Sequence, residues 1–283
     1  MGVGHAPGKV ILVGEHFVVH GTPAIALPLL GRGVRVETQR EGGAWEMPEH
    51  VARHVSRLLD ELGEEAHSLT IRVSSDLPIG AGLGGSAAIA VALVRALYSE
   101  QTLSHEEVRA LAHRLETLAH GNPSGIDDAV ATYACPVRYV KGGVPEPLTD
   151  LVSPSLWVGL SAERTSTLDA VAQVGELARS RPGWFEGVLE KARVVADKAG
   201  LALEGSQWSE LGSLMTDNHR LLQKVGVSTE SLDRLVDSAL GAGAYGAKLT
   251  GGGLGGAVIA LTPEGLDLTD VWREAGAQEV IES

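Results

Sequence analysis

The sequence contains almost no cysteine, and this limits how the fold can be held together. Cys135 is the only cysteine among 283 residues, so no disulfide can form within the chain. The first residues, Met1 to Ala6, also lack the basic region and the apolar core of a signal peptide. We therefore expect a cytoplasmic protein, because reducing compartments do not require disulfides.

Long apolar segments and excess positive charge are missing as well. The longest run without a charged residue, 77–94, is half glycine loop, so no segment is predicted to span a membrane. The formal net charge is −13, whereas binding to a nucleic acid or an anionic membrane would require a basic face. The sequence thus predicts neither partner, although a local pocket can still hold phosphate.

What the chain does contain is a mixture of predicted strands and helices without regular alternation, which indicates an α+β fold. Apolar or alternating β-prone runs predict strands at 9–13, 17–20, 24–27, 33–38, 69–73, 137–140, 156–160, 247–250, 257–261 and 279–281. Helical spacing of apolar residues predicts helices at 48–62, 89–97, 104–119, 126–134, 166–178, 184–199, 209–225 and 229–240. The proline-rich stretch 145–154 is the best boundary, which gives domains 1–150 and 151–283.

The stretch 77–88 organises the functional interpretation. It reads Leu-Pro-Ile-Gly-Ala-Gly-Leu-Gly-Gly-Ser-Ala-Ala and leads from a glycine-rich loop into a predicted helix. Its glycines leave backbone N–H groups exposed, and its small residues let a ligand approach the helix N-terminus. Because such N–H groups and the helix dipole attract anions, we expect a phosphate site; a tight turn without a ligand is the alternative.

Two familiar phosphate motifs fit this chain poorly. The segment 80–85 formally matches G-x-G-x-x-G, but residues 74–79, with Pro78, separate it from the preceding strand, which disfavours a dinucleotide fold. A Walker A loop needs Lys followed by Ser or Thr, whereas Gly8-Lys9 is followed by Val10. A nucleotide kinase of another kind remains the better interpretation.

Two histidines share one face of a predicted helix. His50 and His54 are four residues apart and could in principle share a metal ion. Because no third ligand lies nearby in the sequence, we interpret both as solvated side chains.

Three motifs, in the right order, resemble those of the GHMP kinases: segments 6–16, 78–88 and 248–256. Within that family, segments 14–21 and 120–127 resemble the members that phosphorylate mevalonate, and 217–222 adds a weaker match. The resemblance implies a two-domain fold, with an N-terminal domain like ribosomal protein S5 and a ferredoxin-like C-terminal domain. It implies transfer of phosphate from ATP to the primary alcohol of mevalonate, with Mg²⁺, and a homodimer.

The resemblance also implies a set of site residues. The ATP-phosphate loop comprises Pro78, Gly80, Ala81, Gly82, Leu83, Gly84, Gly85, Ser86 and Ala87. Family members usually have serine where this chain has Gly85. Ser86 and Glu116 are the implied metal ligands, because Mg²⁺ prefers oxygen donors.

For catalysis, the family match places the base at Asp127, near the start of a predicted helix that would keep its carboxylate ionised. The neighbouring Asp128 competes for this role. Lys9 is the only lysine before Lys141, and it either acts on the substrate hydroxyl with Asp127 or meets the transferring phosphoryl group.

The mevalonate-binding residues are expected to be Lys9 and Asp127 together with Glu15, His16 and Thr250. His16 could donate to the substrate carboxylate, and Glu15 could hold Lys9 or a hydroxyl. Thr250, with the second glycine-rich loop, either supports the site or reaches the substrate. Two functions remain as alternatives: another GHMP kinase, for phosphomevalonate or another hydroxy acid or sugar, and a sensor that binds ligand without turnover.

Overall fold

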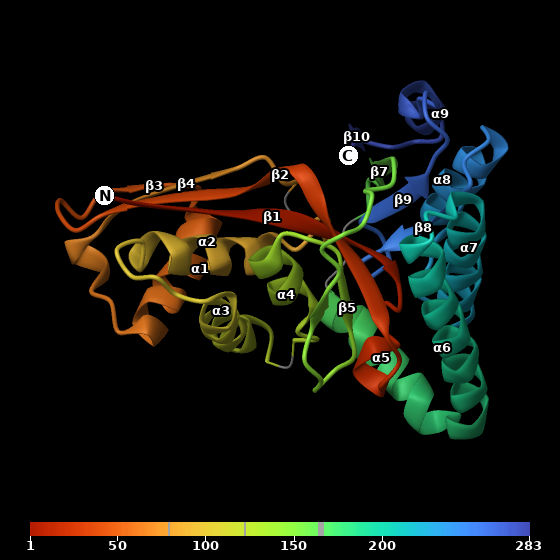
Figure 1. The fold of residues 1–283 in the computed structure, drawn as a ribbon, viewed down its shortest axis with the longest axis horizontal. Helices are drawn as coiled ribbons and strands as arrows, with labels where there is room; N and C mark the ends of the chain where they lie inside the picture. The colour runs from red at the N-terminus through yellow and green to blue at the C-terminus, as the bar shows by residue number, and fades with distance from the viewer. Residues whose placement is uncertain (79, 122, 164–166) are drawn as a thin grey trace. The chain divides into compact units, whose positions relative to one another are not determined.

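The computed structural model describes residues 1–78, 80–121, 123–163 and 167–283, and it confirms the α+β fold (Figure 1). Of the segments predicted above, Ile79, Asn122 and Ser166 lie outside the described residues. The chain forms two compact units. Unit 1 comprises Met1–Lys9, Pro28–Ile79 and Gly84–Cys135, and unit 2 comprises Val10–Leu27, Gly80–Leu83 and Pro136–Ser283. The predicted domain boundary near residue 150 stays a prediction, because each of these compact units combines several separate segments of the chain.

Unit 1 contains strands of a six-stranded sheet, in which β4 (Thr70–Ser75) lies between β2 (Ala24–Gln39) and β3 (Trp45–Glu46). β4 pairs antiparallel with β2, from Val34 opposite Ser75 to Gln39 opposite Thr70, and parallel with β3. β1 (Gly2–Val13) also pairs with β2. In β2, Val34 and Val36 are buried while Arg35 is exposed, so the predicted half-buried strand is confirmed.

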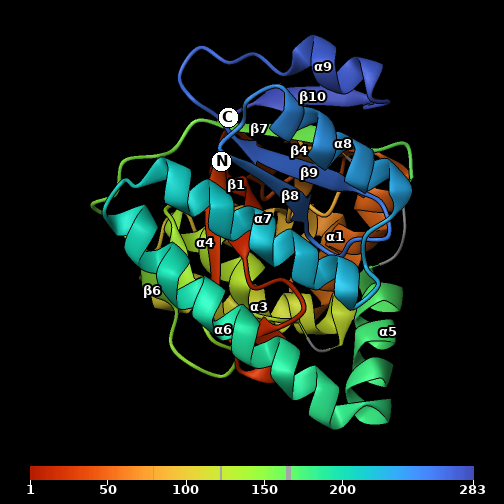
Figure 2. The same cartoon turned by 90° about the vertical axis from the view of Figure 1, so that its right-hand side faces the viewer.

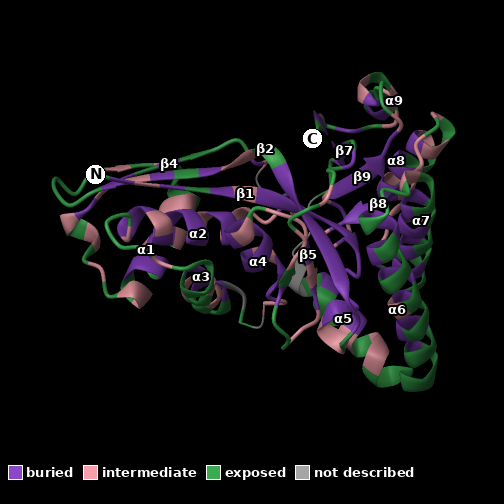
Figure 3. Cartoon of the chain, viewed as in Figure 1, coloured by how far each residue is buried: buried purple, intermediate pink, exposed green. Residues whose placement is uncertain are grey.

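Four helices of unit 1 lie on one side of these strands (Figure 1): α1 (Glu49–Leu62), α2 (Gly85–Leu97), α3 (His105–His120) and α4 (Ile126–Tyr133). A 3₁₀ turn, Ala66–Ser68, follows α1. α2 is rich in alanine and mostly buried (Figure 3), and it lies directly against β1. A Cβ on Gly4 would be 2.0 Å from the carbonyl oxygen of Ala92, so only glycine permits this approach.

The predicted helix signals of unit 1 correspond to real helix ends. Gly63 terminates α1 in the left-handed conformation, with φ of 71°. Ser104 and Glu107 form the capping box predicted at the start of α3. These two termini position α1 and α3, both of which carry side chains of the candidate site.

Unit 2 is built on an antiparallel sheet with strand order β10-β7-β9-β8. Its strands are β7 (Leu156–Leu160), β8 (Gly246–Thr250), β9 (Ala257–Leu261) and β10 (Glu279–Glu282). Every residue of β7, β8 and β9 is buried (Figure 3). The six-stranded sheet also includes β5 (Val137–Tyr139), which pairs with the first residues of β2, and β6 (Glu146–Pro147), which pairs with β5.

Five helices complete unit 2: α5 (Thr167–Ser180), α6 (Pro182–Glu204), α7 (Trp208–Lys224), α8 (Glu230–Gly241) and α9 (Thr269–Glu274). α6 and α7 lie side by side, and α7 and α8 pack against β8 (Figure 2). Trp272 of α9 is fully buried and donates from Nε1 to the carbonyl of Leu235 at 2.9 Å. Within the described ranges, no helix is both long and apolar enough to cross a membrane.

Two local predictions are wrong, and one helix was not predicted. Segment 17–20 is not a strand: Val18–His20 is a 3₁₀ turn that ends at Gly21 in the left-handed conformation. The predicted strands 24–27 and 33–38 are one strand, β2, which continues through Pro28 and Gly31. The short helix α9 was missed, because six residues are too few to show helical periodicity.

Candidate active site

The first glycine-rich loop ends at Gly84, which is the N-cap of α2. Gly84 has φ of 76° and ψ of 22°, and α2 begins at Gly85, four residues before the predicted start. A Cβ on Gly84 would be 2.8 Å from Cγ of Lys9, so glycine makes room for the lysine as well as for the left-handed backbone. At Gly85, by contrast, a Cβ would meet no atom within 4 Å.

The remaining residues of the predicted ATP loop are divided between the two units. Pro78 lies in unit 1 and is half-buried, and Ala87 lies buried inside α2. Gly80, Ala81, Gly82 and Leu83 belong to unit 2. There, a Cβ on Gly251 would be 3.0 Å from the carbonyl oxygen of Gly82, so the two glycine-rich stretches are in contact.

Lys9 and Asp127 form an ion pair in unit 1. Nζ of Lys9 is 3.2 Å from Oδ1 of Asp127; the lysine side chain is 4% exposed and the aspartate side chain 36% exposed. Asp127 is the second residue of α4, where the helix N-terminus stabilises negative charge. The lysine is therefore held in place while the carboxylate stays accessible.

The neighbouring Asp128 has different surroundings. Its side chain is 1% exposed, and Oδ2 lies 3.1 Å from Nδ1 of His113 and 3.7 Å from a guanidinium nitrogen of Arg109. Burial raises the pKa of Asp128 to about 6. The structure thus separates the two aspartates that the sequence left in competition: Asp128 connects α4 to α3, and Asp127 pairs with Lys9.

Ser86 and Glu116 are joined by a short hydrogen bond. Oγ of Ser86, in the first turn of α2, donates to Oε1 of Glu116 on α3 at 2.6 Å. Glu116 is 4% exposed, and burial raises its pKa to about 7; the bond from Ser86 lowers the pKa, and the charge of Asp127 raises it. A nearby cation would favour the ionised carboxylate.

Two side chains with oxygen donors, Ser86 and Glu116, thus lie together where they could hold a divalent cation. Among the residues that the structure describes, no group of three or more His, Cys, Asp or Glu side chains could hold a metal ion. Mg²⁺ typically uses only one or two carboxylates and completes its shell with water and substrate phosphates. The hydroxyl of Ser86 and the carboxylate of Glu116 fit that donor set.

His54 differs from the sequence-based interpretation. His50 is exposed, as expected for a solvated side chain, but His54 is half-buried on α1, with Nε2 3.3 Å from Oγ of Ser86. The four-residue spacing indicated a shared helix face. It could not indicate that this face meets α2, because that contact depends on tertiary packing.

In unit 2, His16 contacts the second glycine-rich loop. Nε2 of His16 is 2.8 Å from the carbonyl oxygen of Gly252. Because a carbonyl only accepts hydrogen bonds, Nε2 carries the hydrogen, and Nδ1 of the neutral ring is an acceptor. Burial lowers the pKa of His16 to about 4, so the ring is neutral near pH 7. Its φ of 59° is unusual for a residue other than glycine.

Glu15 is buried beside His16 and is bonded on both oxygens. Oε1 accepts from the ammonium of Lys248, and Oε2 accepts from Nδ2 of Asn218 at 3.0 Å. Lys248 is fully buried and also donates to the carbonyls of Ile11 and Leu249. Burial raises the pKa of Glu15, and the charge of Lys248 opposes this.

Thr250 supports the end of β1. Its Oγ1 accepts from the backbone N–H of Ile11 at 2.8 Å and lies 3.3 Å from the carbonyl oxygen of the same residue. Sequence reasoning did not assign roles to Lys248 or Asn218, although both lie in segments that carry the resemblance. Which side chains they contact could not be read from a motif.

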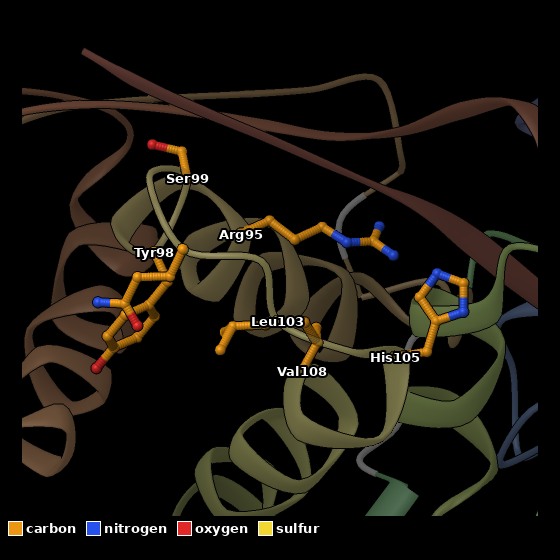
Figure 4. Close-up of a pocket in the computed structure, with 7 residues that line it drawn as sticks. Arg95, Tyr98, Ser99, Leu103, His105 and Val108 are labelled. Atoms are coloured by element: carbon orange, nitrogen blue, oxygen red, sulfur yellow. The ribbon is translucent and has the colours of Figure 1, made fainter.

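The predicted residues therefore form two groups. Lys9, Ser86, Glu116 and Asp127 come together in unit 1, and Glu15, His16 and Thr250 come together in unit 2. A cavity of about 190 Å³ in unit 1 contains none of them (Figure 4). It is lined by Arg95, Tyr98, Ser99, Gln101, Leu103, His105 and Val108.

Comparison with known protein families matches both halves of the chain. The GHMP kinases N terminal domain matches residues 49–135, and the GHMP kinases C terminal domain matches residues 201–282. These two matches, together with the fold and the site, show that the chain is a GHMP kinase.

Comparison with individual proteins identifies the family within the GHMP kinases to which the chain belongs. The mevalonate kinase of Thermococcus gammatolerans is 35% identical over 297 residues, which cover 92% of this chain and 88% of that protein. The mevalonate kinase of Pyrococcus abyssi is 36% identical over 296 residues, covering 91% and 88%. A crystal structure of L. major mevalonate kinase in complex with R-mevalonate superposes with a TM-score of 0.87, at 29% identity, covering 100% of this chain and 95% of that one. The chain belongs to the mevalonate kinase family.

Proposed function

We propose that this chain transfers the γ-phosphoryl group of ATP to the primary alcohol of mevalonate, giving 5-phosphomevalonate and ADP for isoprenoid precursor synthesis. The observation that carries the proposal is the ion pair of Lys9 and Asp127, at 3.2 Å, beside the glycine that caps α2. A held cation and an accessible carboxylate next to a helix N-terminus are the parts that phosphoryl transfer to an alcohol needs. The named relatives support mevalonate as the acceptor.

Asp127 is the proposed base. Its carboxylate accepts the hydroxyl proton as the substrate oxygen bonds to the γ-phosphorus. The bond between that phosphorus and the β–γ bridging oxygen breaks, and ADP leaves with the electron pair. Its 36% exposure supports this role, because a base must reach the substrate. Asp128, which is 1% exposed and bonded to α3, is poorly placed for it.

Lys9 has two proposed roles, and the geometry is compatible with both. Its ammonium can stabilise the substrate oxygen as that oxygen loses its proton to Asp127. Alternatively, it can neutralise charge on the transferring phosphoryl group, since it packs against Gly84 at the start of α2. The phosphate chain of ATP is proposed to lie on the N–H groups of the first turn of α2, which begins at Gly85.

Mg²⁺ is the proposed cofactor, and Ser86 and Glu116 would hold it. When bound, Mg²⁺ neutralises charge on the β- and γ-phosphates during transfer. The pKa of about 7 at Glu116 supports a cation there, because the carboxylate pays a burial penalty that a positive charge would relieve. Ser86 contributes by holding that carboxylate in one orientation at 2.6 Å.

In unit 2, His16 is the proposed mevalonate contact, with Glu15 and Thr250 behind it. A neutral ring with its hydrogen on Nε2 presents Nδ1 as an acceptor, which suits a substrate hydroxyl better than the carboxylate first expected. Glu15 could bond to the substrate only by giving up its hydrogen bond from Asn218 or its ion pair with Lys248. Thr250 is proposed to support the site rather than to touch substrate, because both of its contacts are to Ile11.

A homodimer, a cytoplasmic location and the division into domains 1–150 and 151–283 remain predictions. Light scattering on the purified chain tests the dimer.

The function is tested by ADP release with ATP, Mg²⁺ and a panel of acceptors: mevalonate, phosphomevalonate, galactose and homoserine. We expect turnover with mevalonate and background rates with the others. A higher kcat/KM for another acceptor would favour a different GHMP kinase, and nucleotide binding without any turnover would favour a sensor.

A further inference from the structure

Three helices of unit 1 each place one side chain at the start of α2. His54 comes from α1, Ser86 from α2 itself and Glu116 from α3, and their polar atoms form a chain of two contacts, at 3.3 Å and 2.6 Å. α1 packs against both α2 and α3, and Arg114 fixes it further by bonding to Glu61 with its Nε at 2.9 Å. The position of His54 is therefore set by helix packing.

The direction of these bonds follows from the number of hydrogens available. The hydroxyl of Ser86 has one hydrogen, and it is donated to Oε1 of Glu116 at 2.6 Å. The contact between Oγ of Ser86 and Nε2 of His54 then requires the imidazole to donate. His54 thus presents an N–H group beside the first turn of α2.

That N–H lies where the proposed function places an anion. The residues already assigned to this group supply two carboxylates, Glu116 and Asp127, and one cation, Lys9. A nucleoside triphosphate would bring several more negative charges, which favours a further hydrogen-bond donor there. Gly85, next to Ser86, has open space for a side chain, but as a glycine it offers no hydroxyl donor to the phosphates.

We propose that His54 is a nucleotide-binding residue, whose Nε2–H exchanges its 3.3 Å contact with Oγ of Ser86 for a hydrogen bond to the phosphate chain of ATP. The inference rests on the proposed function, since it assigns the anion as ATP. His54 is half-buried, so part of its ring remains accessible to a ligand. His50, one turn earlier on α1, is exposed and provides a matched control on the same helix.

The test measures the Kd of a non-hydrolysable ATP analogue, in the presence of Mg²⁺, by isothermal titration calorimetry. It compares wild type with four variants: His54→Leu, His54→Asn, His54→Gln and His50→Leu. Leucine removes the donor, asparagine is too short to reach Oγ of Ser86, and glutamine can still donate. We expect Kd to rise about tenfold for His54→Leu and His54→Asn, the effect of one charge-assisted hydrogen bond. His54→Gln should recover most of the affinity, and His50→Leu should bind like wild type.

Steady-state kinetics give a second readout. KM for ATP should rise in parallel with Kd, whereas KM for mevalonate should stay within about twofold, because the donor acts on the nucleotide alone. The inference is overturned if both His54→Leu and His54→Asn bind the analogue as wild type does, if the two KM values rise equally, or if His50→Leu has the same effect. Wild-type protein that binds no analogue at all would instead refute the proposed kinase function, and the assignment of His54 with it.

Discussion

The carboxylate of Asp127, in the first turn of α4, lies 3.2 Å from the ammonium of Lys9, at the end of the unit 1 segment of β1. The lysine is almost fully buried and the aspartate is not, so the pair has one fixed and one accessible partner. An accessible carboxylate next to a fixed cation can accept a proton from an alcohol that binds beside it.

Replacement of Asp127 should therefore separate catalysis from folding. We expect Asp127→Asn to lower kcat on the order of 10²-fold or more, because asparagine cannot accept the hydroxyl proton. The melting temperature should change little, since the side chain is partly exposed. Coupled ADP release and thermal unfolding measure the two effects, and near-normal turnover would remove Asp127 from its proposed role.

Two adjacent glycines should respond in opposite ways to the same substitution. Gly84→Ala places a methyl group 2.8 Å from Cγ of Lys9 on a backbone with φ of 76°, and should cost roughly 1–2 kcal/mol of stability and at least about tenfold in kcat. Gly85→Ala enters open space at the start of a helix and should be neutral or stabilising by up to about 1 kcal/mol. Denaturant unfolding and kcat of the two variants check this; equal losses would contradict the geometry.

Glu116→Gln tests the metal ligand. We expect a higher Mg²⁺ requirement, because an amide oxygen carries no charge to hold the cation at the hydroxyl of Ser86. Activity measured against free Mg²⁺ at constant ATP gives the midpoint, which should move to higher concentration by roughly tenfold or more. A titration curve unchanged from wild type would count against Glu116 as a ligand.

The lowered pKa of His16 predicts how stability depends on pH. The folded protein protonates His16 near pH 4, while the unfolded chain does so near the ordinary value of 6.5. Between these values the unfolded state binds more protons, so this residue makes the free energy of unfolding fall as pH drops from 6.5 to 4, by up to about 3 kcal/mol. Above pH 6.5 it should contribute no slope.

His16→Asn isolates this effect, because asparagine tolerates the positive φ of this position. Urea unfolding of both proteins from pH 4.5 to 7.5 should show a shallower decline for the variant. Parallel curves would mean that His16 is already charged or is not buried in solution. Nitrogen-15 spectra of the imidazole should show the hydrogen on Nε2 at pH 7.

The sequence was sufficient for the parts of the site that lie within continuous motifs. A helix after the glycines, the capping box at Ser104 and the carboxylate at the start of α4 all depend on neighbouring residues and are all found, although α2 begins four residues before its predicted start. Likewise, strand β7 could be predicted to its end residues, because an apolar run of this length, bounded by turn-forming residues, is too short for a typical helix.

What the sequence could not provide is contact between distant segments. The partners of Glu15 are Lys248 and Asn218, and the neighbour of Ser86 is His54. No local pattern encodes these contacts, since they arise from helices and strands that pack together only in the folded chain. The long strand β2 was divided for a related reason: Pro28 and Gly31 disfavour a strand locally, and its pairing with neighbouring strands outweighs that preference.

The proposed function requires that this chain phosphorylates mevalonate with Asp127 as the base. The most direct measurement is phosphorus-31 NMR of a reaction with ATP, Mg²⁺ and mevalonate, run in parallel with wild type and Asp127→Asn. We expect equal amounts of ADP and 5-phosphomevalonate with wild type, and at most about one hundredth of that rate with the variant. ADP without a phosphomonoester of mevalonate, or the same product at the same rate from both proteins, would contradict it.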